Sequence, residues 1–262
     1  MLIALMVNAK KGISASQISR DLGITYKSAW FSAMRVRCAM LDQATMLHGI
    51  IESDAMYVGG KPRHRYSSAD NEANLSTVTT QKKRTKSKKV PVVGFVERED
   101  LKRIVVKMFN NNPTSRELMS MLKRYVKEDG SKLMTDDAKE YKVLGKEIEH
   151  YSVNHSKGEY ARKKGKLSVH TNTIEGFWSM FKNGLRGQYH VLSKKYLPFY
   201  LSEFAFKYNM RNNQDLSFIE TIERAVNDPK CVTKYKPTKN PRTIAYRRKK
   251  KKASCGKEHR CF

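Results

Sequence analysis

The sequence has little of what membrane proteins and disulfide-rich secreted proteins need. No apolar stretch reaches the roughly 18 residues that a membrane-spanning helix requires. The apolar start, residues 1–7, is far too short for a signal peptide. The four cysteines show no framework spacing, which is typical of a protein in a reducing compartment. These absences predict a soluble protein of the cytoplasm with no membrane partner.

Acidic residues are also scarce. The chain has 25 Asp and Glu against 52 Lys and Arg, which leaves a net charge of +27. Such an excess repels itself unless a polyanion binds, so nucleic acid is the expected partner. Residues 60–89 hold nine basic against two acidic residues, and residues 227–262 hold thirteen against two. Both segments lack apolar periodicity, which predicts a flexible basic insertion and a basic, disordered C-terminal tail.

The first part of the chain, residues 1–45, predicts a helix-turn-helix DNA-binding region. Ser14 and Gln17 match a capping box, Gly23 ends that helix, and Thr25 caps the next one. A plain helical hairpin is the alternative, but the basic charge favours DNA binding. We expect three basic residues of the second helix to contact DNA: Lys27, Arg35 and Arg37.

Residues 46–226 predict one mixed α/β domain. Strands are expected in GIIESDAMYVGG, VPVVGFVER, LKRIVVKMF, KLMTDD and IEHYSV. Helices are expected at residues 113–128, 138–144, from Asn172 onward, in LPFYLSEFAFKYNMR, and at 216–226. A meander of three strands followed by alternating helices and strands is the order of a ribonuclease H-like fold, a mixed sheet flanked by helices. In that topology the fourth strand lies beside the first.

Three acids on separate elements are candidates for chemistry. Asp54 lies in the middle of the first strand, where an unpaired carboxylate is costly. Asp136 ends the fourth strand, with Asp137 as its adjacent alternative, and strand ends carry the chemistry of open α/β sheets. Glu175 lies near the start of the helix that begins at Asn172, where a capping-box role at position N3 is the alternative.

The helix wheel favours a role in a site for Glu175. One stripe of this helix is apolar, and the stripe beside it holds Glu175, Ser179, Lys182 and Arg186. Three converging carboxylates need a counter-charge, and hard oxygen ligands select Mg²⁺ or Mn²⁺. Two such ions about 4 Å apart suit phosphodiester chemistry. Lys182 and Arg186 are then candidate phosphate contacts.

Four other residues have a functional and a structural interpretation. His170 is expected either to contact a phosphate or the metal site, or to have a structural or exposed role. Tyr189 and His190 are candidates for the lining of a DNA channel. Glu203 is expected to pair with Lys207, four residues later on one helix, rather than to act as a fourth metal ligand.

Four stretches resemble the ISXO2-like transposases of the IS1595 group of bacterial insertion sequences. They are ISASQISRDLGITYKSAWFSAMRVRCAM, IESDAMYVGGK, MTDDAKEYKVLG and VHTNTIEGFWSMFKNGLRGQYHVLSKKYLPFYLSEFAFKYNMR. The resemblance implies a ribonuclease H-like catalytic domain with a D-D-E triad, whose acids fall on Asp54, Asp136 and Glu175. Two features depart from the family pattern. Ala55 stands where members usually have a second acid, and the chain starts almost at the helix-turn-helix, without the cysteine-rich zinc ribbon that members often carry.

Together these features predict a D-D-E DNA transposase. It would cleave the ends of an insertion sequence and transfer the 3′ hydroxyl to target DNA, with Asp54, Asp136 and Glu175 holding two Mg²⁺ or Mn²⁺ ions. Because such enzymes bring two DNA ends together, a homo-oligomer on DNA is expected, associated with the nucleoid. Two alternatives stay open: a non-catalytic DNA-binding remnant, favoured by Ala55 and the short N-terminus, and a ribonuclease H-like nuclease that cuts without joining.

Overall fold

The computed structural model describes residues 1–41, 46–59, 89–99, 102–127, 129–153, 161–164 and 167–227. The expected basic insertion and basic tail therefore lie almost entirely outside the described residues. None of the helices in this described part of the chain is long and apolar enough to cross a membrane.

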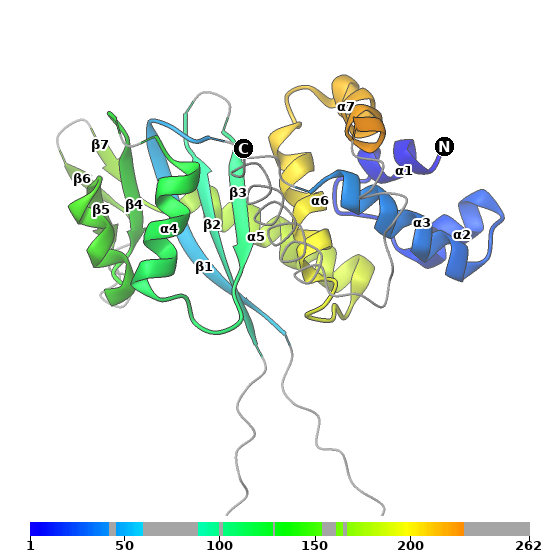
Figure 1. Ribbon diagram of the computed structural model, residues 1–262, viewed down its shortest axis with the longest axis horizontal. Helices are drawn as coiled ribbons and strands as arrows, with labels where there is room; N and C mark the ends of the chain where they lie inside the picture. Colours follow the sequence, from blue (N-terminus) through cyan, green and yellow to red (C-terminus); the bar gives the residue numbers. More distant parts are fainter. Residues whose placement is uncertain are drawn as a thin grey trace, which may run out of the picture.

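A five-stranded mixed sheet forms the larger end of the molecule (Figure 1). Its strands are β1 (Ile50–Val58), β2 (Val90–Glu97), β3 (Ile104–Met108), β4 (Lys132–Asp136) and β5 (Glu149–Val153). The strand order is β3-β2-β1-β4-β5. β1, β2 and β3 form an antiparallel meander, whereas β4 pairs in parallel with both β1 and β5. The predicted meander and the position of the fourth strand beside the first are confirmed.

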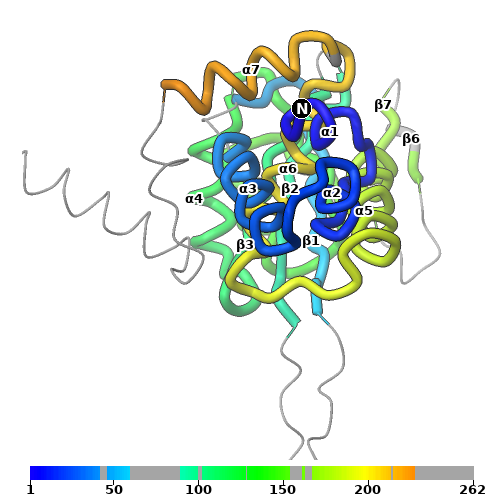
Figure 2. Tube along the Cα trace, turned by 90° about the vertical axis from the view of Figure 1, so that its right-hand side faces the viewer, coloured from blue at the N-terminus to red at the C-terminus, as the bar shows by residue number. Residues whose placement is uncertain are grey.

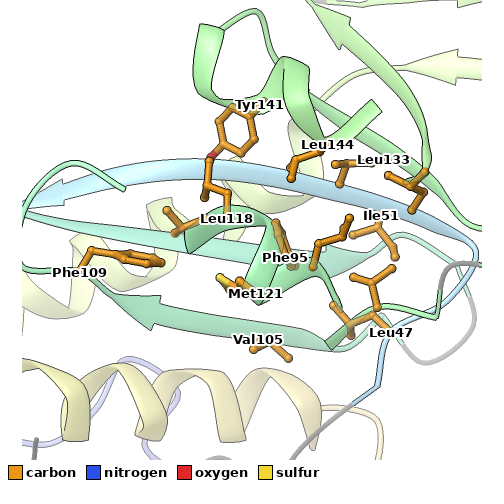
Figure 3. Close-up of a cluster of buried hydrophobic side chains, with 14 residues drawn as sticks. Leu47, Ile51, Phe95, Val105, Phe109, Leu118, Met121, Leu133, Tyr141 and Leu144 are labelled. Carbon is orange, nitrogen blue, oxygen red and sulfur yellow. The ribbon is translucent and has the colours of Figure 1, made fainter. Parts of the chain in front are cut away.

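One face of the sheet is covered by α4 (Ser115–Tyr125) and the 3₁₀ helix η2 (Lys139–Lys146). Thr114 and Glu117 form a reciprocal capping box at the start of α4. The core on this face joins the sheet to both helices, as Figure 3 shows for Ile51, Phe95, Leu118, Met121, Leu133 and Leu144. Burial of each such side chain stabilises the fold by about 1.5–3 kcal/mol relative to its exposed state.

The opposite face is covered by α5 (Asn172–Gly184) and α6 (Leu197–Asn209), which are linked through the π-helical turn η4 (Leu185–Tyr189). The predicted apolar stripe of α5 packs on this face, with Ile174, Phe177, Trp178 and Phe181 all buried. Gly94 of β2 permits a close approach, because a Cβ atom there would lie 3.0 Å from Trp178 Cζ2 and 3.1 Å from Ile174 Cδ1. The sheet therefore holds α5 tightly against β1 and β2.

A small two-stranded sheet precedes α5. Its strands, β6 (Arg162–Lys164) and β7 (Leu167–Val169), pair antiparallel and were not predicted. Three residues are too few to show an alternating pattern, so the sequence carried no signal for them. β7 leads directly into α5.

The remaining helices gather beyond α6, on the side away from the sheet (Figures 1 and 2). They are α1 (Leu2–Asn8), α2 (Ala15–Leu22), α3 (Tyr26–Ala39) and α7 (Gln214–Asn227). The hydroxyls of Ser14 and Thr25 cap α2 and α3 as expected, and Gly23 ends α2 at φ +63°. The predicted capping box at Ser14 is only half formed, because the Gln17 side chain bonds to Asp21 and not back to the start of the helix. Phe206 of α6 belongs to the same apolar core as α1, α2 and α3, so these helices pack directly on the domain that carries the sheet.

Candidate active site

The first two acids lie side by side on neighbouring parallel strands. β1 and β4 pair with Ser53 opposite Thr135, which places the next residues, Asp54 and Asp136, in the same register. The Oδ1 atom of each aspartate accepts a hydrogen bond from the backbone N–H of the residue that follows it, at 2.7 Å in both cases. Both carboxylates line the same cleft, on the face of the sheet that α5 covers.

α5 supplies the third acid and most of the cleft wall. The open cleft has a volume of about 440 Å³ and is lined by Asp54, Asp136, Thr171, Glu175, Trp178, Ser179, Lys182, Asn183 and Arg186. The structure thus brings the three predicted acids together with the two predicted phosphate contacts on α5 and η4.

The capping-box interpretation of Glu175 is wrong. The helix takes Thr171, not Asn172, as its N-cap residue, so Glu175 lies one position beyond N3. The Glu175 carboxylate instead accepts a hydrogen bond from the Thr171 hydroxyl, with 2.9 Å between Oγ1 and Oε1. This side chain is exposed at the cleft, whereas Thr171 is buried beneath it.

The charges of the cleft act on one another. Burial raises the pKa of Asp54, and the negative charges of Glu175 and Asp136 raise it further. The Ala55 N–H and Lys182 act in the opposite direction and lower this pKa, but they do not cancel the rise. Asp54 therefore has an electrostatic environment in which an added positive charge is favourable.

Carboxylates are the ligands that Mg²⁺ and Mn²⁺ prefer, so Asp54, Asp136 and Glu175 are the residues of this cleft that could hold such an ion. Within the described residues, no three His, Cys, Asp or Glu side chains converge closely enough to form a ready metal site. The donor chemistry fits a divalent ion, while the three side chains line the cleft without meeting at one point.

Ala55, which replaces an acid usual in the resembling family, faces away from the cleft. Successive residues of a strand point to opposite faces of the sheet. Ala55 accordingly pairs with Val93 and packs against the core of α4 and η2. An acid at position 55 would point to that core, so its absence removes no carboxylate from the cleft.

Glu52 is a residue of this region that the sequence reasoning missed. It is fully buried, although it lies on the same strand face as Asp54. Its Oε2 atom accepts the backbone N–H groups of Thr173 at 2.8 Å and Ile174 at 3.0 Å, and its Oε1 atom pairs with Arg98 Nε at 2.8 Å. An acid two residues before Asp54 was the available signal, but only the structure shows which groups it meets.

His170 makes structural contacts beside the cleft. Its ring Nδ1 lies 3.2 Å from Arg98 and 3.3 Å from Glu52 Oε1. Burial and the charge of Arg98 lower the pKa of His170, against the opposing effect of Glu52 and Glu175. The lowered pKa favours the neutral imidazole over one that forms an ion pair with Glu52.

Two of the candidate DNA contacts on α3 are accessible. Lys27 is exposed and Arg35 is half-buried, with its guanidinium 5.3 Å from the centre of the Phe31 ring. The prediction that Arg37 contacts DNA is wrong, because its side chain is only 2% exposed. Arg37 lies on the helix face that packs against α6, where its Nε atom is 2.6 Å from Glu203 Oε2.

Glu203 and Tyr189 belong to this buried network and not to the cleft. The predicted pair of Glu203 with Lys207 is confirmed, at 2.6 Å between Oε1 and Nζ. The Tyr189 hydroxyl lies 3.3 Å from both Arg37 and Glu203, so its polar end belongs to this network. His190 is exposed and stays a candidate.

Comparisons with known proteins point to one family. The model of the ISXO2-like transposase domain of the IS1595 family matches residues 46–209. Among curated proteins, none matches the chain.

Two similar solved structures are the crystal structure of the Mos1 strand transfer complex and that of a pre-cleavage Mos1 transpososome. They are 11% and 10% identical, with TM-scores of 0.35 and 0.37. The alignments cover 89% and 87% of this chain and 76% and 77% of theirs. At TM-scores this low, neither structure bears on the assignment. The family match spans more than half of the chain and includes the three acids of the cleft, and the protein therefore belongs to the ISXO2-like transposase domain family.

Proposed function

We propose that the protein is a metal-dependent DNA transposase in which Asp54, Asp136 and Glu175 form the catalytic triad. The observation that carries this proposal is the in-register placement of Asp54 and Asp136 on parallel strands, across one cleft from Glu175. Membership in a transposase domain family supports it. The strand order, with an antiparallel meander followed by two parallel strands, supports a ribonuclease H-like core.

The three carboxylates are proposed to hold two Mg²⁺ or Mn²⁺ ions. When bound, such ions activate a water or hydroxyl nucleophile and stabilise the leaving oxygen of a phosphodiester. The raised pKa of Asp54 supports this role, because its largest charged contributors are the other two acids. Lys182 and Arg186, farther along the same wall, are proposed to bind the phosphates that flank the scissile bond.

The reaction is proposed to proceed in two steps. Water attacks the phosphodiester at the end of the element, which breaks one P–O bond and leaves a 3′ hydroxyl and a 5′ phosphate. The 3′ hydroxyl then attacks a phosphodiester of the target, so that one P–O bond forms as another breaks and no external energy source is needed. Lys27 and Arg35, in a proposed helix-turn-helix formed by α2 and α3, would contribute to DNA binding.

We further propose that the protein acts as a homo-oligomer at the nucleoid.

The test uses the full chain and labelled DNA from the genomic flanks of its own gene, with Mg²⁺ or Mn²⁺. We expect the wild type to cut at the element ends and join them to target DNA, and the Asp136→Ala variant to bind the same DNA without cutting it. Equal binding by both proteins with no cutting would overturn the proposal in favour of a non-catalytic DNA-binding protein. Cutting without any joined product would favour a ribonuclease H-like nuclease.

A further inference from the structure

The N-terminus of α5 is not capped by its own N-cap residue. A helix begins with backbone N–H groups that have no partner within the helix, and a side chain at the N-cap position usually accepts one of them. In the described part of the chain, the N-cap residue Thr171 makes no such bond, because its hydroxyl is directed to Glu175. The first turn of the helix that carries Glu175 therefore depends on another acceptor.

Glu52 is that acceptor, although it lies 121 residues away in the sequence. Its Oε2 atom receives the N–H groups of the second and third helical residues, Thr173 and Ile174. Its Oε1 atom receives the Thr173 hydroxyl at 2.9 Å. A negative charge at this end of a helix also interacts favourably with the helix dipole. One carboxylate of β1 thus joins the strand that carries Asp54 to the first turn of α5.

A second layer of contacts holds Glu52 in place. Arg98, which follows β2, donates from Nε to Glu52 Oε1 and from its terminal nitrogens to the backbone carbonyls of Ser168 at 2.6 Å and His170 at 2.9 Å. Arg98 therefore ties the carboxylate to the segment that leads into α5. Glu52 thus connects β1 to α5, and the hydrogen bonds of Arg98 hold the Glu52 side chain in this position.

We propose that Glu52 is a positioning residue of the active site, which caps α5 from β1 and thereby fixes Glu175 relative to Asp54. Because Glu52 accepts the N–H groups of the first turn, the Thr171 hydroxyl bonds to Glu175 and not to the helix backbone. Glu52 is fully buried, so we assign it to the positioning of α5 and not to contact with DNA or the reacting atoms. Its effect on catalysis rests on the proposed function, whereas its effect on α5 does not.

The chain offers a matched control for this proposal. Glu97 of β2 is also fully buried, with Arg103 Nε at 3.4 Å from Oε2 and the His48 ring Nδ1 at 2.8 Å from Oε1. Like Glu52, it is a buried carboxylate of the five-stranded sheet, but His48 and Arg103 both lie outside α5. Glu52→Gln and Glu97→Gln thus remove comparable charges, and only the first should disturb the wall of the cleft.

The first experiment measures amide hydrogen exchange in the full-length protein without DNA or metal. In Glu52→Gln the side chain is neutral and keeps one acceptor oxygen, which cannot serve both Arg98 and the two helix N–H groups, so the amides of Thr173 and Ile174 should exchange at least about tenfold faster. The amides of β2 at Val93 and Phe95 should be unaffected, and Glu97→Gln should leave Thr173 and Ile174 protected. Equal protection of these two amides in the wild type and in Glu52→Gln would overturn the proposal, whether or not the protein cleaves DNA.

The second experiment links the cap to catalysis through a milder pair of variants. Thr173→Val removes the hydroxyl that bonds to Glu52, and Thr173→Ser retains it. We expect Glu52→Gln to slow single-turnover cleavage of bound element ends by about 100-fold, as displacement of a catalytic group by about 1 Å can do, while DNA affinity changes less than about twofold. Thr173→Val should be slowed less and Thr173→Ser should match the wild type.

The outcomes separate the two proposals. Equal slowing by Glu52→Gln and Glu97→Gln, or by both Thr173 variants, would show a general structural effect and overturn the positioning role. If the wild type fails to cleave with either metal, the proposed function fails, and the amide exchange still decides whether Glu52 caps α5.

Discussion

The buried ion pair between α3 and α6 can be broken from either side, with different expected costs. Arg37 and Glu203 are 2% and 0% exposed, and Lys207 Nζ also approaches Glu203 within 2.6 Å. Glu203→Gln leaves two cations facing a neutral amide. Arg37→Met removes one cation and leaves Glu203 paired with Lys207.

Loss of one partner of a buried pair costs about 3–5 kcal/mol, because it leaves an uncompensated charge away from water. Glu203→Gln is expected near 5 kcal/mol and Arg37→Met nearer 3 kcal/mol, since only the first leaves two charges unpaired. A small domain has roughly 5–15 kcal/mol in total, so either variant should lower the melting temperature clearly. The control is Glu220→Gln, which breaks the more exposed pair of Glu220 with Arg224 on α7 and should cost less than about 1 kcal/mol.

The assay is urea unfolding of the full-length variants, combined with DNA binding at a temperature where all of them stay folded. We expect the ranking Glu203→Gln, then Arg37→Met, then Glu220→Gln in lost free energy of unfolding, with DNA affinity of Arg37→Met within about twofold of wild type. The reasoning is refuted if Arg37→Met unfolds like the wild type but loses DNA affinity by about tenfold, which corresponds to 1.4 kcal/mol. That result would restore Arg37 as a DNA contact.

Three further predictions concern the same network, the cleft and the opposite face of the sheet. Burial alone would raise the pKa of Glu203, but Arg37 and Lys207 lower it below its ordinary value. Ionised Glu203 should therefore stabilise the protein fully at pH values above the pKa that this carboxyl has in the unfolded chain. This contribution should be lost as the pH falls through the lower pKa of the folded state. Measurements of the free energy of unfolding against pH should show this loss in the wild type and not in Glu203→Gln. Lys182→Ala and Arg186→Ala should each reduce the slope of log affinity against log salt concentration by about 1, measured by DNA titration at several salt concentrations; unchanged slopes would exclude phosphate contacts. Ala55→Glu should cost about 1–3 kcal/mol of stability and leave the cleavage rate no higher, because the added carboxylate points to the core of α4 and η2; faster cleavage would show that position 55 acts on the cleft.

The sequence predicts those features that a local pattern encodes. The apolar and β-branched residues that precede a Gly pair place β1 correctly, and the helical spacing from Ile174 to Phe181 places α5, and with them Asp54 and Glu175. Both helix caps near the N-terminus, Ser14 and Thr25, are equally local.

What the sequence does not predict depends on which elements meet in space. Arg37 has the polarity of a surface residue, and its burial follows from a carboxylate 166 residues later on α6. Glu52 also has the polarity of a surface residue. It accepts the N–H groups of α5 only because the first turn of that helix lies beside β1. No periodicity within β1, α3 or α5 encodes these partners.

Two adjacent aspartates provide the most direct test that the cleft is the catalytic site. Asp136 lines the cleft, whereas Asp137 pairs with Lys142 of η2 at 3.4 Å and is not among the residues of the cleft wall. The measurement is the single-turnover cleavage rate of element-end DNA by Asp136→Asn and Asp137→Asn, at saturating protein and with equal DNA binding verified. Loss of a metal-binding carboxylate is worth several kcal/mol, so the account predicts at least about a thousandfold lower rate for Asp136→Asn and a rate within about threefold of wild type for Asp137→Asn. Equal losses in both variants, or a loss confined to Asp137→Asn, would contradict the account.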